Sequence, residues 1–274
     1  MAEKELTLEE IHEETLKLYK TIEKICDEIG INCFTIYGTL LGTVRHKGYI
    51  PWDDDFDIVM MRPDYDRFCA WCKEQGEALL PYRLSNGFED TDLGFTISRF
   101  CDTRFRYETL NHKEVKKLGL FIDIYPYDGL GCDREEALQT MKDRIPYEKC
   151  LSVAYSKRMF DFSQGVAFGL LRAVTFLCTR LISKKYLIHK IWEITTRHRF
   201  EDSTIVGLVI WGYNTVLFDK SWFDEKVVMP FEDTTVYAPK GYEAFLTTFF
   251  GDYMQLPPEE KRKPYHGYYL YRRG

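Results

Sequence analysis

Residues 37–58, YGTLLGTVRHKGYIPWDDDFDI, decide the fold of this chain. A short apolar run, residues 32–37 (NCFTIY), predicts a buried strand that leads into a turn at Gly38 and Thr39. A brief helical turn through residues 40–44 is expected next. A strand that runs into a Gly-Thr turn is a familiar way of binding phosphate, because backbone N–H groups are exposed there. The segment therefore predicts a mixed α/β fold with a phosphate site at this turn.

Acidic residues close the same stretch, with four aspartates at 53, 54, 55 and 57. Their mutual repulsion is unfavourable unless a cation or a basic partner offsets it. Residues 55–60 (DFDIVM) predict a strand with Asp55 and Asp57 on one side, roughly 7 Å apart, and Phe56 and Ile58 toward the core. Two such carboxylates suit Mg²⁺ or Mn²⁺. The bland alternative is a solvated acidic turn.

A third acid and three basic residues extend this pattern. Asp123 stands in the predicted strand 118–125 (LGLFIDIY), which Pro126 is expected to end. A lone charge in an apolar strand is costly without a partner, so Asp123 is predicted as a third acid of the metal site. Arg45, His46 and Lys47 supply positive charge of the kind that a phosphorylated substrate requires.

The remainder of the chain predicts mainly helices around this core. Thr7 and Glu10 form a capping box before a helical apolar stripe that Gly30 ends, and Pro63 suits the first turn of another helix. A helical pattern runs from about 134 to 199, and one or two strands are expected in 205–217. We expect a catalytic core in 1–133, a helical, basic insertion in 134–200, and a C-terminal part, 201–274, that completes the core.

Composition and charge exclude several classes of protein. Of 274 residues, 45% are hydrophobic and 29% charged, so disorder and low complexity are excluded. The net charge of −6 argues against non-specific wrapping of nucleic acid, and we expect no nucleic-acid partner. The N-terminus, MAEKELTLEE, lacks the apolar core of a secretory signal, and the longest uncharged stretch, 203–218, is too short for a membrane span. These features predict a cytoplasmic protein.

Residues 157–199 differ in charge from the rest of the chain, with nine Lys or Arg and two acids, a net charge of +7. Apolar residues interrupted by single arginines are typical of a helix on a membrane surface. The other reading is a core helix whose arginines extend outward to water. Peripheral contact with the inner face of the membrane through this segment is one expectation.

Three runs together resemble the LicD family: GTLLGTVRHKGYIPWDDDFDI, then FIDIYPYDGL, then FFGDYMQLPPEEKRKPYH near the C-terminus. LicD proteins are phosphotransferases typified by enzymes that add phosphocholine to bacterial surface glycans, and they are related to fukutin-type proteins. The resemblance spans residues 30–270, with 134–200 the least diagnostic part. It implies a nucleotidyltransferase-like mixed sheet with flanking helices, in which Gly38 and Thr39 hold phosphate and Asp55, Asp57 and Asp123 hold the metals.

The resemblance also implies the reaction. A phospho-substituent, phosphocholine first among them, would move from a CDP-linked donor to a hydroxyl of a cell-surface glycan or its lipid-linked precursor, with release of CMP. Asp123 would complete the metal site or accept the hydroxyl proton. Trp52 would stack on the cytosine or merely pack as a lid. His266, in the third run, is expected to contact phosphate.

Two other functions fit the same acids. A nucleotidyltransferase would use an NTP and release pyrophosphate, and a glycosyltransferase would turn over UDP-sugars. A non-catalytic adaptor on a membrane surface fits the basic segment, but it has no use for a buried Asp123. The identity of the donor discriminates the enzymes from one another.

Overall fold

The computed structural model describes residues 4–90, 93, 96–109, 118–156, 159–160, 163, 165–212, 215–264 and 267–273. The chain forms two compact units. The first consists of Met1–Asn86, Ser98–Tyr127 and Lys220–Gly274, and the second of Gly87–Ile97 and Asp128–Asp219. The second unit therefore begins before the predicted insertion and ends after it. The assignment of catalytic and acceptor roles to these parts stays a prediction.

The first unit is built on a mixed sheet with the strand order β1-β2-β6-β4-β3, in which β2 and β6 are parallel and the other neighbours antiparallel. Its strands are β1 (Phe34–Thr35), β2 (Asp57–Met61), β3 (Tyr82–Asn86), β4 (Ser98–Asp102) and β6 (Leu120–Gly129), the last of which continues into the second unit. Two separate antiparallel pairs accompany it: β5 (Phe105–Thr109) with β11 (Tyr268–Arg272), and β9 (Lys226–Phe231) with β10 (Thr234–Pro239).

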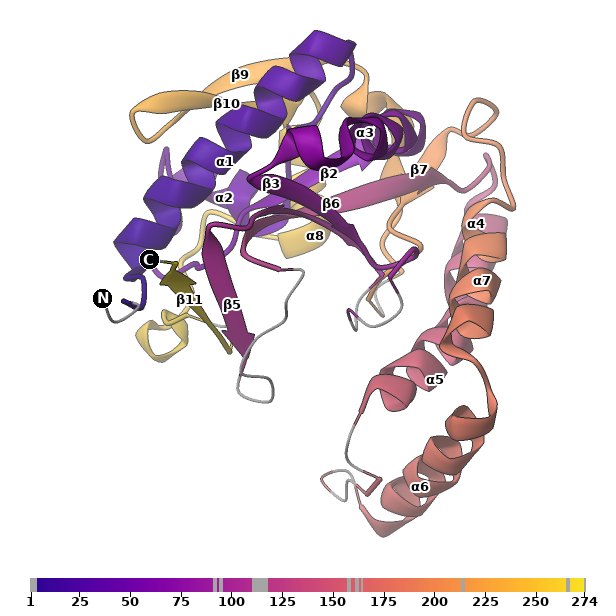
Figure 1. Ribbon diagram of the computed structural model, residues 1–274. Helices are drawn as coiled ribbons and strands as arrows, with labels where there is room; N and C mark the ends of the chain where they lie inside the picture. The colour runs from indigo at the N-terminus through magenta and orange to yellow at the C-terminus, as the bar shows by residue number, and fades with distance from the viewer. Residues whose placement is uncertain are drawn as a thin grey trace. The chain divides into compact units, whose positions relative to one another are not determined.

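The helices of this unit lie on both faces of the sheet, with α1 and α3 on one side and α8 on the other (Figure 1). They are α1 (Leu8–Ile29), α2 (Tyr37–Arg45), α3 (Arg62–Gln75) and α8 (Tyr242–Phe250), with short 3₁₀ turns at Gly76–Leu79, Lys220–Phe223 and Glu259–Lys261. The expected α/β class, a mixed sheet with flanking helices, is confirmed.

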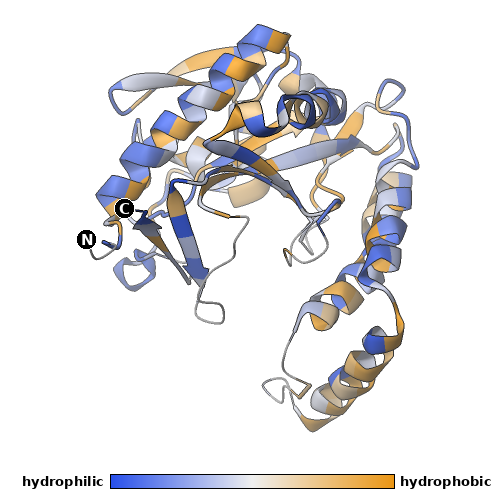
Figure 2. Ribbon diagram, in the orientation of Figure 1, coloured by the Kyte–Doolittle hydropathy of each residue, from blue (hydrophilic) through white to orange (hydrophobic). Residues whose placement is uncertain are grey.

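The main core lies between α1, α3 and one face of the sheet. Hydrophobic residues alternate with hydrophilic ones along α1 (Figure 2), and its apolar stripe, which includes Leu18 and Ile22, is buried in this core. Phe56, Ile58 and Met60 belong to the same cluster, as predicted for Phe56 and Ile58. Because side chains alternate along a strand, the residues between them point to the opposite face. The odd-numbered residues of β2, Asp57 first among them, are thereby turned away from the main core.

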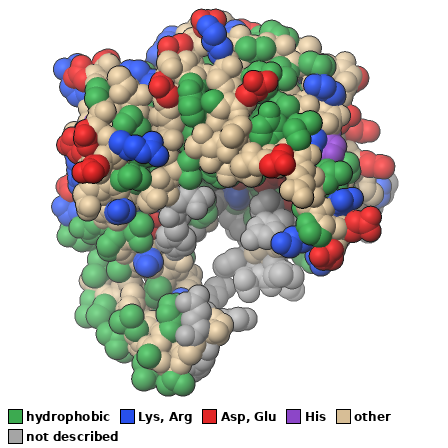
Figure 3. All heavy atoms as spheres, turned by 180° about the vertical axis from the view of Figure 1, so that it is seen from behind, with side chains coloured by type: hydrophobic (Ala, Val, Ile, Leu, Met, Phe, Trp, Pro, Cys, Tyr) green, Lys and Arg blue, Asp and Glu red, His purple; other side chains and the backbone are tan. Residues whose placement is uncertain are grey.

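The second unit is mainly helical, which confirms the pattern predicted from 134 to 199. Its elements are α4 (Arg134–Asp143), α5 (Ile145–Tyr155), α6 (Val166–Leu181), α7 (Lys184–Thr195), β7 (Ile205–Gly207) and β8 (Phe218–Asp219). The last residues of β6, Asp128 and Gly129, pair with β7. Hydrophobic side chains gather at the surface over α6, at the lower left of Figure 3.

Several predicted boundaries are wrong for identifiable reasons. The strand expected in 32–37 pairs over only two residues, because Tyr37 already begins α2. Pro126 does not end β6, since pairing with β4 stops at Ile124 and a strand with one remaining neighbour tolerates a missing N–H. In 205–217 only three residues form a strand, and β8 begins at 218.

Among the residues that the structure describes, no single helix is long and apolar enough to cross a membrane. Only α6 and α7 taken together pass that test, and they are bent by 97° at the break between them.

Candidate active site

The N-terminus of α2 is fixed against the start of β2 by hydrogen bonds between the two ends of residues 36–58. The Ile36 N–H donates to the Asp57 carbonyl at 3.1 Å, and the Asp57 N–H donates to Thr39 Oγ1 at 2.8 Å. The first N–H groups of a helix lack partners inside it and carry partial positive charge. Gly38 and Thr39 thus stand in the first turn of α2 rather than in a separate turn before it.

Gly38 allows a carboxylate to approach this helix start closely. A Cβ at Gly38 would lie 2.6 Å from Asp53 Oδ2, which is nearer than any ordinary van der Waals contact. The loop that carries the aspartates is also held from α1, where His12 Nε2 lies 2.6 Å from the Asp53 carbonyl and the His12 ring stacks on Tyr49 at 3.9 Å. Sequence reasoning did not identify His12 as a support for this loop.

Asp57, Asp123 and Arg99 form a row across three neighbouring strands. Asp57 pairs with Asp123 in the parallel register of β2 and β6, and Asp123 pairs with Arg99 in the antiparallel register of β6 and β4. Adjacent strands lie about 4.8 Å apart, and register partners present their side chains on the same face. The fold therefore brings Asp57 and Asp123 together, as the resemblance implied.

Arg99 supplies the partner that a buried Asp123 requires. Its Nε lies 2.7 Å from Asp123 Oδ1, and its second nitrogen contacts Oδ2 at 3.4 Å. The guanidinium also lies 4.0 Å from the centre of the Phe121 ring. The proximity of Asp123 raises the pKa of Arg99 although burial opposes that shift. Sequence reasoning missed Arg99, whose neighbours are Ser98 and Phe100, so the signal is weaker than for Asp123, which lies between two isoleucines.

Asp57 is the least satisfied acid of the row. Burial, followed by the charges of Asp55 and Asp123, raises the pKa of its carboxyl group well above the ordinary value, and a hydrogen bond with Tyr125 opposes the shift. Its Oδ1 is buried and has no hydrogen-bond partner among the described residues. An orphaned, buried carboxylate oxygen near further carboxylates is a good ligand for a hard divalent cation. Asp57 therefore offers one oxygen of the kind that the expected cation binds.

Three acids are not, however, arranged as a closed cage. Over the residues with defined positions, no group of three or more His, Cys, Asp or Glu side chains is placed to hold a metal ion. Asp55 precedes β2 rather than standing inside it, and its charge still acts on Asp57, whose pKa it helps to raise. Asp54 is buried, unlike a residue of a solvated turn. The metal role of Asp55, Asp57 and Asp123 stays a prediction.

A second group of candidate site residues lies at the other end of α2. Arg45 Nε donates to His46 Nε2 at 3.0 Å, and its NH1 group donates to the Tyr253 carbonyl at 3.0 Å. The Trp52 ring lies edge-on to His46 at 6.2 Å, and the Arg262 guanidinium lies 5.8 Å from the Trp52 ring. Residues 37–52 and the C-terminal segment thus meet around Trp52, and Arg262 is a member that sequence reasoning did not single out.

The charges of this second group favour an anion. Burial and the charge of Arg262 lower the pKa of Arg45, and burial together with Arg45 lowers the pKa of His46. Both shifts arise first from burial and second from a neighbouring cation, and a bound phosphate would oppose both effects. Lys47 is exposed, and its carbonyl accepts from the Glu232 N–H at 2.8 Å, so its backbone is structural. His266 lies outside the described residues.

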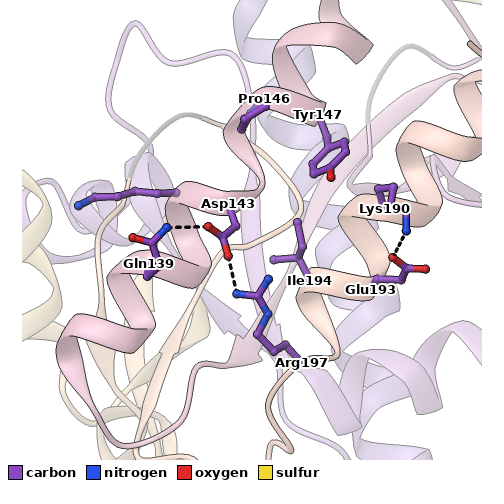
Figure 4. A pocket seen from close by; sticks show the side chains of 9 residues that line it. Gln139, Asp143, Pro146, Tyr147, Lys190, Glu193, Ile194 and Arg197 are labelled. Atoms are coloured by element: carbon purple, nitrogen blue, oxygen red, sulfur yellow. Dashed lines mark hydrogen bonds and ion pairs between the residues drawn. The ribbon is translucent and has the colours of Figure 1, made fainter.

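A cavity of about 590 Å³ in the second unit contains none of the predicted site residues (Figure 4). Its charged side chains already pair with one another, Asp143 with Arg197 and Glu193 with Lys190, each at 2.6 Å.

Comparison with known proteins adds independent evidence. Residues 30–160 match the family model described as LicD/FKTN/FKRP, nucleotidyltransferase domain, a range that contains Asp55, Asp57 and Asp123. The lipopolysaccharide cholinephosphotransferase LicD of Haemophilus influenzae is 28% identical over 269 residues, which cover 96% of this chain and 97% of that protein. An uncharacterized protein of Rickettsia typhi is 31% identical over 118 residues, 41% of this chain and 33% of that protein. Residues 30–160 therefore carry a domain of the LicD/FKTN/FKRP type, and the resemblance of this chain to LicD proteins is confirmed.

Proposed function

We propose that this protein is a metal-dependent transferase that moves phosphocholine from a CDP-linked donor to a hydroxyl of a cell-surface glycan or its lipid-linked precursor, releasing CMP. The similarity to the Haemophilus LicD protein, named a lipopolysaccharide cholinephosphotransferase, extends over almost the whole of both chains and supports the reaction class. The observation that carries the proposal is the orphaned carboxylate oxygen of Asp57, a residue whose backbone Thr39 and β6 fix beside the start of α2.

The reaction balances as a substitution at phosphorus. An acceptor hydroxyl attacks the distal phosphorus of the donor, a new P–O bond forms, and the P–O bond to CMP breaks. The hydroxyl proton passes to a carboxylate, and the products are a phosphodiester and CMP. The diphosphate of the donor is negatively charged, and so are the carboxylates of the site. Positive charge is therefore needed near both phosphates of the donor, the one that is transferred and the one that leaves with CMP.

A divalent cation, held by Asp55 and Asp57, would neutralise the diphosphate and stabilise CMP as it leaves. The remaining roles fall to residues of the chain. The first turn of α2, at Gly38 and Thr39, donates backbone N–H groups to a phosphate oxygen. Asp123 accepts the hydroxyl proton, because each of its oxygens keeps a second lone pair beyond the contact with Arg99.

The group around Trp52 binds the nucleotide end of the donor. Arg45 and Arg262 bind a phosphate of the donor, and Trp52 stacks on the cytosine. His46 packs edge-on with the Trp52 ring. From Thr39 to Arg45 is about 9 Å along the helix axis, at 1.5 Å per residue. A nucleoside diphosphate is long enough to contact both ends of α2, which accounts for two separate groups of functional residues.

The test is product identity in a reaction with CDP-choline, lipopolysaccharide and Mg²⁺. We expect CMP release and a new phosphodiester signal in ³¹P NMR, both abolished by EDTA. Asp57→Asn should lower the rate by about a hundredfold or more, whereas Asp66→Asn, an exposed acid of α3, serves as the matched control. Pyrophosphate release from an NTP, or full activity of Asp57→Asn, contradicts the proposal. Parallel reactions in which another donor replaces CDP-choline identify the donor that the enzyme uses: CDP-ethanolamine, CDP-glycerol, CDP-ribitol and a UDP-sugar.

A further inference from the structure

The helix α6 presents large apolar side chains to solvent and small ones to its neighbour. Gly169 and Ala173 are buried on the side that packs against α5, where their size allows close approach. The large residues point the other way: Leu171 is 66% and Leu181 90% exposed. This distribution is the reverse of an ordinary amphipathic helix of a globular protein. It contradicts the reading of α6 as a core helix.

Six exposed residues of α6 form one stripe, which we call the α6 face: Val166, Leu170, Leu171, Val174, Leu177 and Leu181. Phe168, which is 38% exposed, lies outside it. At 100° per residue all but Leu171 fall within about 80° of the helix circumference. The stripe is about 22 Å long, at 1.5 Å per residue. An exposed apolar surface of this size marks a binding site in a soluble fold.

The arginines of α6 do not interrupt this face. Arg180 donates to the carbonyls of Ala154 and Ser156 at 3.3 and 3.1 Å, and Arg172 donates to Ser156 Oγ at 2.7 Å. Arg180 therefore satisfies carbonyls at the C-terminal end of α5, where helix carbonyls lack partners, although the residue itself is exposed. Arg172 is half-buried and donates to the Ser156 hydroxyl. Neither arginine lies within the apolar stripe, so the α6 face is purely aliphatic.

Basic residues follow the stripe directly. Lys184 and Lys185 begin α7, Lys185 is exposed, and Tyr186 beside it is 50% exposed. From 165 to 199 the chain has seven Lys or Arg and one acid, although the whole protein carries −6. Positive charge and an amphipathic aromatic residue at the edge of an aliphatic face match the headgroup region of an anionic membrane.

We propose that the α6 face lies in the interface of an anionic lipid bilayer, with α6 parallel to the membrane plane. A protein partner is the weaker fit, because hot spots of protein interfaces are rich in Trp, Tyr and Arg and poor in Leu and Val, and the stripe contains only Leu and Val. The bend of 97° after α6 suits a helix that lies on a membrane rather than one that spans it. The inference is independent of the proposed reaction.

The test is flotation of the full chain with vesicles of phosphatidylcholine, alone or mixed with phosphatidylglycerol. The parent protein should float with the mixed vesicles and much less with phosphatidylcholine alone. Leu170→Gln with Leu177→Gln should weaken binding at least about tenfold, and Lys185→Gln about fivefold. Leu80→Gln with Val228→Gln, equally exposed apolar residues of the first unit, is the matched control that should float as the parent does.

A second measurement locates the contact. Vesicles with brominated acyl chains should quench the added tryptophan of Val174→Trp. The melting temperatures of the α6 variants should equal that of the parent, which shows that they fold. No flotation of the parent, equal flotation of the double Leu variant, or no quenching overturns the inference. A parent dimer that the double Leu variant converts to a monomer also overturns it and assigns the face to a second copy.

Discussion

The ion pair between Arg99 and Asp123 should behave as a buried, coupled unit whose two members cannot be removed independently. The side chains are only 16% and 8% exposed, and the contact is two-pronged, with distances of 2.7 and 3.4 Å. The perturbation is a double-mutant cycle of Arg99→Met, Asp123→Asn and the combination of both.

The magnitudes follow from burial. Arg99→Met leaves a buried carboxylate without its partner, which costs about 3–5 kcal/mol of unfolding free energy. Loss of the contact between the guanidinium and Phe121, at 4.0 Å, adds about 0.5–1 kcal/mol. In the combined variant no charge is left unpaired, so we expect it to be more stable than the sum of the single changes by about 2 kcal/mol. Arg99→Lys should keep part of the stability that Arg99→Met loses, but not all of it, because an ammonium group lacks the planar fork of the guanidinium.

Urea unfolding at pH 7 without added metal measures the free energy of each variant from its midpoint. Effects that add to within about 0.5 kcal/mol would refute the reasoning, since they would mean that Asp123 does not depend on Arg99. A loss below about 1 kcal/mol in Arg99→Met would refute the burial argument in the same way.

Three further outcomes are expected. Without metal, burial and the neighbouring carboxylates raise the pKa of Asp57 in the folded protein. Its contribution to the free energy of unfolding is therefore full below the unfolded pKa of about 3.9 and is lost as the pH rises. Asp57→Asn should melt higher than the parent at pH 7 in EDTA and equally near pH 4, and a lower melting temperature at pH 7 would contradict this. Thr39→Val removes the acceptor of the buried Asp57 N–H and should cost about 1–3 kcal/mol in urea unfolding, whereas Thr39→Ser, which keeps the hydroxyl, should cost less. Gly42→Ala would place a Cβ 2.5 Å from the Gly48 carbonyl, a backbone atom, and should lower stability by about 1–3 kcal/mol; an unchanged melting temperature would count against the close packing of α2.

Local signals in the sequence predicted the first helix well. Thr7 and Glu10 form the capping box, and Gly30 ends α1 in the left-handed conformation. These features depend on residues within one turn of each other, so no distant contact is needed to predict them. The strand that carries the acids was predicted two residues too early, because pairing with β6 begins only at Asp57. Asp55 therefore stands in the loop, a placement that periodicity alone does not determine.

The sequence by itself determined which acids and which glycine-threonine pair form the candidate site, because the residue types within each short motif indicate its chemistry. Only the tertiary structure decided what they contact. Register across three strands chose Arg99 as the partner of Asp123, and the return of the C-terminal segment brought Arg262 to Trp52. Packing of α5 on the small residues of α6 turned the leucines outward. Each outcome depends on segments far apart in the chain, whose pairing is set by the burial of the whole core rather than by local preference.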